Sequence, residues 1–257
     1  GDVYEINLSQ PFLAEGELAS PTAVFEQLTE ISPVPFAGYF RWLDRHLICA
    51  SPERFLRHNA GVLTSQPIKG TAAREKDDPK QDALNQAELR ASEKERAENV
   101  MIVDLVRNDL HRSCKTGSVQ VPHLFDLQTF TKVHHLVSSV QGQLREDVDA
   151  LTALRYAFPP GSMTGAPKVS AMELIEHYER AARELYAGSI GYISPEADFD
   201  FNVVIRSFSY DAQQCLISYN MGGAITWDSD PLAEYEETLI KARAIRQLFG
   251  EEAVRLG

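Results

Sequence analysis

The sequence predicts an α+β fold, and three observations support this prediction. Stretches typical of strands occur along the whole chain, interspersed with segments of helical apolar spacing. They show no regular strand–helix–strand alternation, which argues against a doubly wound parallel sheet. The chain has 257 residues, of which 44% are hydrophobic and 24% charged, as in an ordinary globular enzyme. Because this length is near the limit for one hydrophobic core, we expect one domain, residues 1–257, or two interleaved halves.

The first part of the chain is expected to be mostly strands. Residues 3–8 predict a strand, and a helix begins at Ser20-Pro21, because serine is a good N-cap and proline suits the first helical position. Turns at 44–45 and 59–61 separate further strands, the last of them at 62–68. The polar stretch 75–91 is interpreted as a weak helix or a loop.

The remaining elements follow from apolar periodicity. A long helix is expected at about 93–111, and the apolar residues of its second half predict that it is buried. Further strands are expected at 134–144, 188–194, 201–209 and 214–227, and further helices at 148–157, 168–185 and 231–249.

Composition excludes several classes of protein. The formal net charge of −12 argues against nucleic acid as a partner, because phosphate binding needs a basic face. No apolar run approaches the roughly 20 residues of a membrane helix, and residues 1–12 lack the features of a signal peptide. The widely spaced Cys49, Cys114 and Cys215 predict free thiols and a reducing cytosol.

The segment "SQPIKGTAAR" places Lys69 between Pro67 and Gly70. A solvated lysine needs no such neighbours. A lysine between a proline and a glycine is held in position, which raises the question of its chemical role.

Four glutamates suggest a metal site. Glu95 and Glu98 lie three residues apart on the helix expected at 93–111, and Glu234 and Glu237 share this spacing on the last helix. Helix capping by Glu95, a salt bridge of Glu98 and a solvated acidic stripe are the simpler explanations. Taken together, two pairs of carboxylates favour a hard divalent cation, and the lack of histidine or cysteine neighbours favours Mg²⁺ over zinc.

Other polar residues stand out against their surroundings. The loop "PPGSMTGAPK" at 159–168 can present N–H groups to an anion, although an ordinary loop before a helix explains it equally well. His135, Tyr192 and Arg206 interrupt apolar strands. An arginine inside a strand needs an anionic partner, which a carboxylate substrate would supply.

Nine motifs occur in the order found in the chorismate-utilising enzymes, and the chain is identified as a member of that family. They are "SPERFL", "PIKGT", "RAENVMIVDLVRND", "HHLVS", "GSMTGAPKVSAMELI", "GSIGYIS", "VVIRS", "GGAI" and "AEYEETLIKAR". The family includes anthranilate, isochorismate, salicylate and aminodeoxychorismate synthases. The lysine of "PIKGT" resembles the aminodeoxychorismate branch, because anthranilate synthases typically carry alanine there.

The resemblance implies a β-sandwich flanked by helices, with the N-terminal part of the family fold missing here. It implies that Mg²⁺ is bound by Glu98 and Glu237 directly and by Glu95 and Glu234 through water. It also implies a set of residues that bind chorismate: Gly70, Thr71, His135, Thr164, Lys168, Tyr192, Arg206, Gly222 and Gly223.

The resemblance further implies a mechanism. Lys69 matches the nucleophile that attacks C2 of chorismate, and Glu53 matches the acid that protonates the departing 4-hydroxyl. Ammonia then gives 4-amino-4-deoxychorismate, the precursor of para-aminobenzoate and folate. No glutaminase motif surrounds the cysteines, and the resemblance implies a separate glutamine amidotransferase subunit as the partner that supplies ammonia. An anthranilate synthase-like enzyme and a non-catalytic chorismate-binding module are the alternatives.

Overall fold

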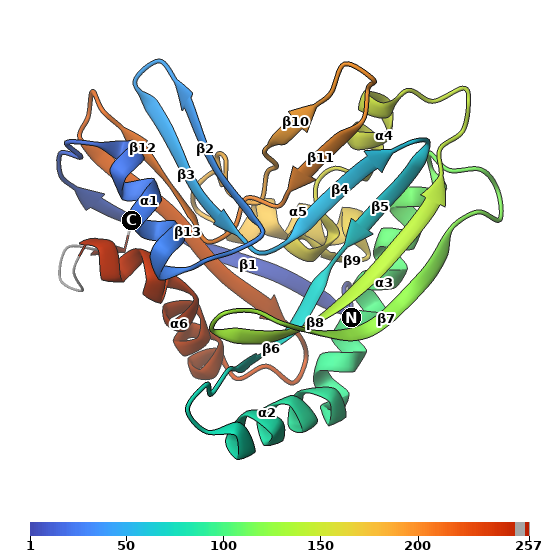
Figure 1. Cartoon of the computed structure of the whole chain (residues 1–257), viewed down its shortest axis with the longest axis horizontal. Coiled ribbons are helices and arrows are strands. Elements are labelled where there is room, and N and C mark those ends of the chain that lie inside the picture. The colour runs from blue at the N-terminus through green and yellow to red at the C-terminus, as the bar shows by residue number, and fades with distance from the viewer. Residues whose placement is uncertain (250–254, 257) are drawn as a thin grey trace. The chain divides into compact units, whose positions relative to one another are not determined.

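The computed structural model describes residues 1–249 and 255–256, which form two compact units (Figure 1). The first unit comprises Gly1–Pro52, Met163–Ile190 and the chain from Asn202 onward. The second comprises Glu53–Ser162 and Gly191–Phe201. Each unit therefore combines segments that are distant in the sequence, as two interleaved halves would. That residues 1–257 act together as one catalytic domain stays a prediction.

The first unit is built on an antiparallel sheet of seven strands. Its longest pairing joins the first strand to the strand at Leu216–Ile225, with Ile6 opposite Ile225 and Glu15 opposite Leu216. The sheet order is β14-β1-β13-β12-β3-β2, and β9 also pairs with β1. The strands are β1 (Glu5–Glu15), β2 (Phe36–Trp42), β3 (Arg45–Ser51), β9 (Gly165–Ala166), β12 (Ser207–Asp211), β13 (Leu216–Ile225) and β14 (Arg255–Leu256).

Helices cover this sheet and close its core (Figure 1). Helix α1 (Pro21–Ile31) contacts β3, and α6 (Pro231–Phe249) contacts β13 and α1. Their apolar residues pack with alternate residues of the strands; Leu28, Ile48, Phe208 and Ile245 are fully buried there. Helix α5 (Lys168–Tyr178) contacts β1 and β9.

The second unit holds another antiparallel sheet of seven strands. Its order is β10-β11-β4-β5-β8-β6, and β7 pairs with β8. The strands are β4 (Arg54–Asn59), β5 (Val62–Gln66), β6 (Ile68–Ala73), β7 (Gln120–Thr129), β8 (Val133–Gln143), β10 (Gly191–Ile193) and β11 (Phe199–Asn202). The helices are α2 (Pro79–Ala91), α3 (Glu93–His111) and α4 (Ala150–Ala157), and a 3₁₀ turn follows at Gly161–Met163. Helix α3 contacts β8, β6 and α4.

The structure confirms the α+β class and most predicted elements. Helix α3 has the predicted bounds, and α1, α4 and α6 agree within two residues. The uncertain stretch 75–91 contains α2, which begins with Asp78 as N-cap. The predicted burial of α3 is confirmed for Ile102, Val103 and Val106 but is wrong for Val100, which is 48% exposed. Among the described residues, no helix is long and apolar enough to cross a membrane.

Three predicted boundaries are wrong for local reasons. The strand predicted at 62–68 is divided at Pro67, where the chain passes from β5 to β6. The strand predicted at 201–209 is divided into β11 and β12, because Arg206 adopts φ +54°. The helix predicted at 168–185 ends at Tyr178, and Arg183 instead binds back to Glu179. Strand β7 was not predicted, and its Pro122, Phe125 with φ +61° and two register shifts explain why its pattern is weak.

We expect Leu28→Ala to lower the free energy of unfolding by about 3 kcal/mol, because it leaves a cavity between α1 and the sheet. Leu84→Ala is the matched control, since Leu84 on α2 is 55% exposed and should cost much less. Urea unfolding of both variants measures the difference. Equal midpoints would contradict the assigned core.

Candidate active site

Lys69 lies on β6 and faces the start of α3. Its Nζ is 3.6 Å from Oε2 of Glu98, and the side chains of both residues are only about one-eighth exposed, at 11% and 13%. Lys94 approaches the other oxygen of Glu98 at 4.0 Å. The lysine and the helix carboxylate are 29 positions apart in the sequence, and the fold brings them within ion-pair distance.

A β-bulge positions Lys69. Ile68 pairs with Val137 and Thr71 pairs with His135, so β6 contains one residue more than β8 over this interval. Gly70 takes up the irregularity with φ +89°, a conformation that favours glycine. A Cβ at Gly70 would also lie 3.1 Å from Oε2 of Glu95 and from Leu89. The Lys-Gly pair therefore lets the strand pass close to α3.

Thr71 and His135 form a cross-strand pair. Oγ1 of Thr71 is 2.9 Å from Nδ1 of His135, and the carbonyl of Gly70 is 3.4 Å from the same nitrogen. The ring of Phe130 packs edge-on against the buried imidazole, with centroids 5.4 Å apart. These contacts fix the orientation of His135, and they join three of the residues predicted to bind substrate.

Glu53 is a buried carboxyl group beside Lys69. Burial raises its pKa to about 7, whereas a hydrogen bond with Ser162, the charge of Lys69 and the N–H of Ile68 each lower that pKa. Near neutral pH, a substantial fraction of Glu53 is therefore protonated and can donate a proton. This agrees with the predicted need for a general acid.

The start of α3 supports its two glutamates. Ser92 caps the helix by accepting a hydrogen bond from the N–H of Glu95, at 3.3 Å. Negative side chains are favoured in the first turns of a helix, where unpaired N–H groups concentrate positive charge. Asn99 anchors the following turn to β8, because its Oδ1 accepts a 2.5 Å hydrogen bond from Ser138.

The first unit carries a second cluster of predicted site residues, on α6 and β13. Nζ of Lys241 is 2.6 Å from Oε1 of Glu237 and donates to the carbonyl of Gly222 at 3.2 Å. Glu234 is buried and accepts a hydrogen bond from Ser229 at 2.8 Å. On this face of α6, Glu234 is buried, whereas the side chain of Glu237 is 51% exposed and that of Lys241 is 25% exposed.

The two glycines of β13 allow close approach. A Cβ at Gly222 would collide with the main chain of β1 at Leu8. A Cβ at Gly223 would lie 3.3 Å from Oε2 of Glu234 and 3.5 Å from Nζ of Lys241. A side chain at Gly222 would break the β1–β13 pairing, whereas one at Gly223 would press on the ends of the Glu234 and Lys241 side chains.

Arg206 combines backbone strain with partial burial. It has φ +54°, and its Nη1 donates to the carbonyl of Lys241 at 3.0 Å. Burial lowers the pKa of Arg206, while the charges of Tyr186 and Glu237 raise it. Burial in turn raises the pKa of Tyr186 to about 12. A strained, partly buried cation of this kind is typical of a functional site.

Tyr186 is a residue that our sequence reasoning missed. Tyr192, the predicted neighbour of Arg206, lies on β10 of the second unit and is 67% exposed. Within the first unit, the tyrosine that acts electrostatically on Arg206 is Tyr186. Tyr186 was overlooked because it lies outside every predicted strand. The first tyrosine of "ELYAGSIGY" could have indicated it, since it stands close to the predicted site residue Tyr192.

Thr164 and Lys168 belong to the loop before α5. Thr164 is buried, and its carbonyl accepts from the N–H of Asn7 at 2.8 Å. Arg183 braces the same loop by donating to the carbonyls of Met163 and Asn7, at 2.6 and 2.8 Å. Lys168 begins α5 and is partly buried. The loop predicted to bind an anion is therefore held rigidly.

The predicted metal ligands form two pairs. Glu95 and Glu98 belong to the second unit, and Glu234 and Glu237 belong to the first. Among the described residues, no group of three or more histidine, cysteine or acidic side chains is arranged to hold a metal. The possible metal ligands of each pair are carboxylate oxygens. Each pair also lies beside a lysine, Lys69 or Lys241, so a positive charge is already present next to these carboxylates. This chemistry fits Mg²⁺.

The fold and these two clusters define a chorismate binding enzyme. Residues 1–247 match the family of that description, and the chain belongs to it. The chain resembles a solved structure of anthranilate synthase component I from Streptococcus pneumoniae, with a TM-score of 0.85 and 34% identity. That similarity covers 95% of this chain and 53% of the other.

Curated relatives indicate the branch. The chain is 44% identical over 245 residues to aminodeoxychorismate synthase component 1 of Klebsiella aerogenes, covering 95% of this chain and 53% of the relative. It is 44% identical over 252 residues to aminodeoxychorismate synthase of Streptomyces pristinaespiralis, covering 96% and 34%. The chain thus spans between about a third and a half of the length of these relatives.

The raised pKa of Glu53 predicts a dependence of stability on pH. The folded state favours protonated Glu53, so this contribution to stability is present below the ordinary pKa of 4.5 and is lost as the pH rises through about 7. Relative to wild type, Glu53→Gln should gain stability between pH 4 and 8, by on the order of 3 kcal/mol.

Urea unfolding at several pH values measures this change. Glu93→Gln is the control, because Glu93 is exposed on α3 and should show a pH-independent difference. A constant difference between Glu53→Gln and wild type would show that Glu53 titrates normally.

Proposed function

We propose that the chain is the chorismate-binding catalytic portion of an aminodeoxychorismate synthase, which converts chorismate and ammonia to 4-amino-4-deoxychorismate. The observation that carries this proposal is Lys69, held by the bulge at Gly70 beside the ionisable Glu53. A nucleophile and a proton donor in one buried place suit substitution of a hydroxyl group. The names of the curated relatives support the same activity.

The proposed reaction has two stages. The neutral amine of Lys69 attacks C2 of chorismate, the ring double bonds shift, and the C4–O bond breaks. The departing oxygen takes the proton of Glu53 and leaves as water. Ammonia then attacks C4, the double bonds shift back, and the C2–N bond to Lys69 breaks, which releases the product and the free lysine. Each stage forms one C–N bond and frees one proton from the attacking nitrogen. In the first stage this proton returns to Glu53, and in the second it goes to the departing nitrogen of Lys69, so both residues are regenerated.

The remaining predicted residues are proposed to bind the substrate. Thr71 and His135 offer hydrogen-bonding groups in the second unit, and Gly70 gives access to them. In the first unit, Arg206 and Lys168 supply positive charge for a carboxylate, with Thr164, Gly222 and Gly223 around it. Tyr192 is retained as a predicted contact, and Tyr186 is added because of its effect on Arg206.

We propose Mg²⁺ as the cofactor, with Glu98 and Glu237 as direct ligands and Glu95 and Glu234 acting through water. When bound, Mg²⁺ supplies positive charge for a substrate carboxylate. The position of Glu98 within ion-pair distance of Lys69 and Lys94 supports its assignment as a carboxylate that interacts with a cation.

Ammonia requires a source, and we propose a glutamine amidotransferase subunit as the partner. The relatives called component 1 support this, because that name implies a second component. We also propose the cytosol as the compartment, since Cys49, Cys114 and Cys215 are all free thiols.

Lys69→Ala should lower the rate of aminodeoxychorismate formation by about 100-fold or more, because it removes the nucleophile. We expect some ammonia to be diverted to C2 in this variant, giving a 2-amino product. Mass spectrometry of the products from chorismate, ammonia and Mg²⁺ measures both. Wild type given chorismate without ammonia should show an adduct on Lys69 after acid quenching.

The outcomes separate the candidate functions. Lys115→Ala is the control, because Lys115 forms only an exposed pair with Glu146. Full activity of Lys69→Ala, without an adduct in wild type, would exclude the covalent route. Anthranilate as the wild-type product would favour the anthranilate synthase-like alternative, and the absence of any product would favour a non-catalytic module.

Removal of the metal should abolish turnover, and excess Mg²⁺ should restore it. Glu98→Gln should weaken the apparent affinity for Mg²⁺ by at least about tenfold, because it neutralises a proposed ligand. Titration of activity and of protein-bound Mg²⁺ gives two independent measurements. Glu93→Gln, on the exposed face of the same helix, should bind Mg²⁺ as wild type does. Wild-type turnover in excess EDTA would refute the metal site.

A further inference from the structure

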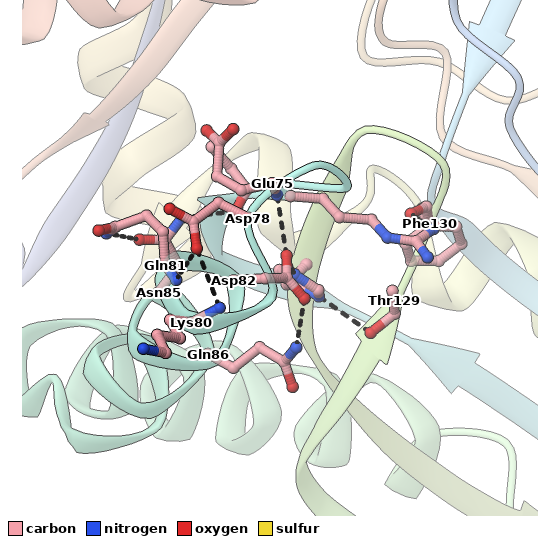
Figure 2. Close-up of polar contacts among 12 residues, drawn as sticks. Glu75, Asp78, Lys80, Gln81, Asp82, Asn85, Gln86, Thr129 and Phe130 are labelled. Atoms are coloured by element: carbon pink, nitrogen blue, oxygen red, sulfur yellow. Dashed lines mark hydrogen bonds and ion pairs between the residues drawn. The ribbon is translucent and has the colours of Figure 1, made fainter.

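Helix α2 is attached to the second unit mainly through polar contacts. Leu89 is its only buried residue, and Leu84 is 55% exposed. Apolar burial therefore contributes little to its position, and a helix of this kind depends on specific hydrogen bonds. The centre of these bonds is Asp82, on the first turn of α2 (Figure 2).

Asp82 accepts hydrogen bonds from three separate places. Its Oδ1 is 2.8 Å from Nε2 of His134 on β8 and accepts from the N–H of Glu75, also at 2.8 Å. Its Oδ2 accepts from Nε2 of Gln86 at 2.8 Å. Figure 2 shows Glu75 and Gln86 on opposite sides of the carboxylate. One side chain thus joins α2, the segment that follows β6, and β8.

His134 is completely buried and bonded at both nitrogens. Its Nδ1 is 2.9 Å from Oγ1 of Thr129 on β7, its cross-strand partner. The hydrogen bond from His134, and next that from Glu75, lower the pKa of Asp82, so the carboxylate is ionised at neutral pH. Because an ionised carboxylate only accepts, Nε2 of His134 carries the proton. The imidazole therefore has a fixed orientation between α2 and β7.

Two further bonds hold the end of β6, one from α2 and one from the segment that follows the strand. Nδ2 of Asn85 donates to the carbonyl of Ala73 at 2.9 Å, at the end of β6. Arg74 donates to the carbonyl of Phe130 at 2.9 Å, which joins the same segment to the β7–β8 turn. The end of β6 is thereby fixed two residues after Thr71 and four after Lys69.

His134 and His135 are consecutive on β8, so their side chains point to opposite faces of the sheet. His135 contacts Thr71, whereas His134 contacts Asp82. We infer that the Asp82–His134 pair is a positioning device for the reaction. It contacts the sheet on the face opposite the side chain of His135 and fixes β6 and β8, so that Lys69, Thr71 and His135 keep their geometry. This role rests on the proposed function, because those three residues belong to the proposed site.

The test compares Asp82→Asn, His134→Gln and the double variant. Asparagine keeps the size of the side chain and one acceptor oxygen but loses the charge. We expect each single variant to lower kcat about tenfold or more, with a smaller change in KM, because small displacements of reacting groups slow the chemical step. The double variant should lose little more than either single variant, because both changes break the same bond.

A second readout needs no chorismate. Acetic anhydride at limiting concentration labels lysines at rates that reflect their access, and Lys69 has a side chain only 11% exposed. Asp82→Asn should increase the labelling rate of Lys69 several-fold, while that of exposed Lys115 stays constant. Asp104→Asn is the matched control, because Asp104 forms only an exposed pair with Arg107 on α3 and should change neither readout.

The outcomes are distinguishable. Wild-type kcat and wild-type Lys69 labelling in folded Asp82→Asn would overturn the positioning role, even if its thermal stability fell. If wild type itself made no product from chorismate, the proposed function would fail, and the labelling rates alone would decide on the positioning role. If Asp82→Asn did not fold, Asn85→Ala would replace it; this variant removes the bond to β6 together with an exposed bond from Gln81 on the same helix, and it should change both readouts in the same direction.

Discussion

The bulge in the pairing of β6 with β8 is the constraint on which the candidate site of the second unit depends. Without it, Lys69 and Gly70 would continue the ladder as ordinary strand residues. With it, the lysine reaches Glu98 and the chain passes close to α3. The positions of α3, of β6 and of the carboxylates on α3 therefore depend on one another.

Both units hold ionisable groups in surroundings that disfavour charge. Burial of Glu53 favours its neutral form, and burial of Arg206 is compensated by Glu237 and the carbonyl of Lys241. Such groups add little to the stability of a fold, because the free-energy cost of desolvating a charge is larger than the stabilisation from most ion pairs. Their presence in both units is physically consistent with an enzyme that binds a dicarboxylate and protonates a leaving group.

Rigidity in this protein comes from polar networks as much as from the core. The apolar cluster around Leu28 and Phe208 fixes the first sheet, but it contains none of the residues predicted to bind substrate. Those residues are held by side-chain bonds to the main chain, such as Arg183 to the loop before Thr164 and Asn85 to the end of β6. Such bonds are directional, so they fix positions that apolar packing leaves adjustable.

The sequence by itself determined the fold class, most of the elements and the motifs that mark the family. Helices such as α1 and α3 were predictable because caps and apolar spacing are local properties. The link between Lys69 and a site was also visible, since its proline and glycine neighbours restrict the backbone locally. That Glu53 belonged to the same site rested on resemblance, because an acidic residue at a strand end carries no local signal of burial.

Only the tertiary structure decided the rest. It showed that Tyr186 affects the pKa of Arg206 within the first unit, and that the strand predicted at 201–209 breaks at Arg206. It also turned the polar stretch 75–91 into a helix attached through Asp82 and His134, residues 52 positions apart. The physical reason is the same in each case: burial, electrostatic coupling and long-range hydrogen bonds depend on residues distant in sequence, and local periodicity contains no information about them.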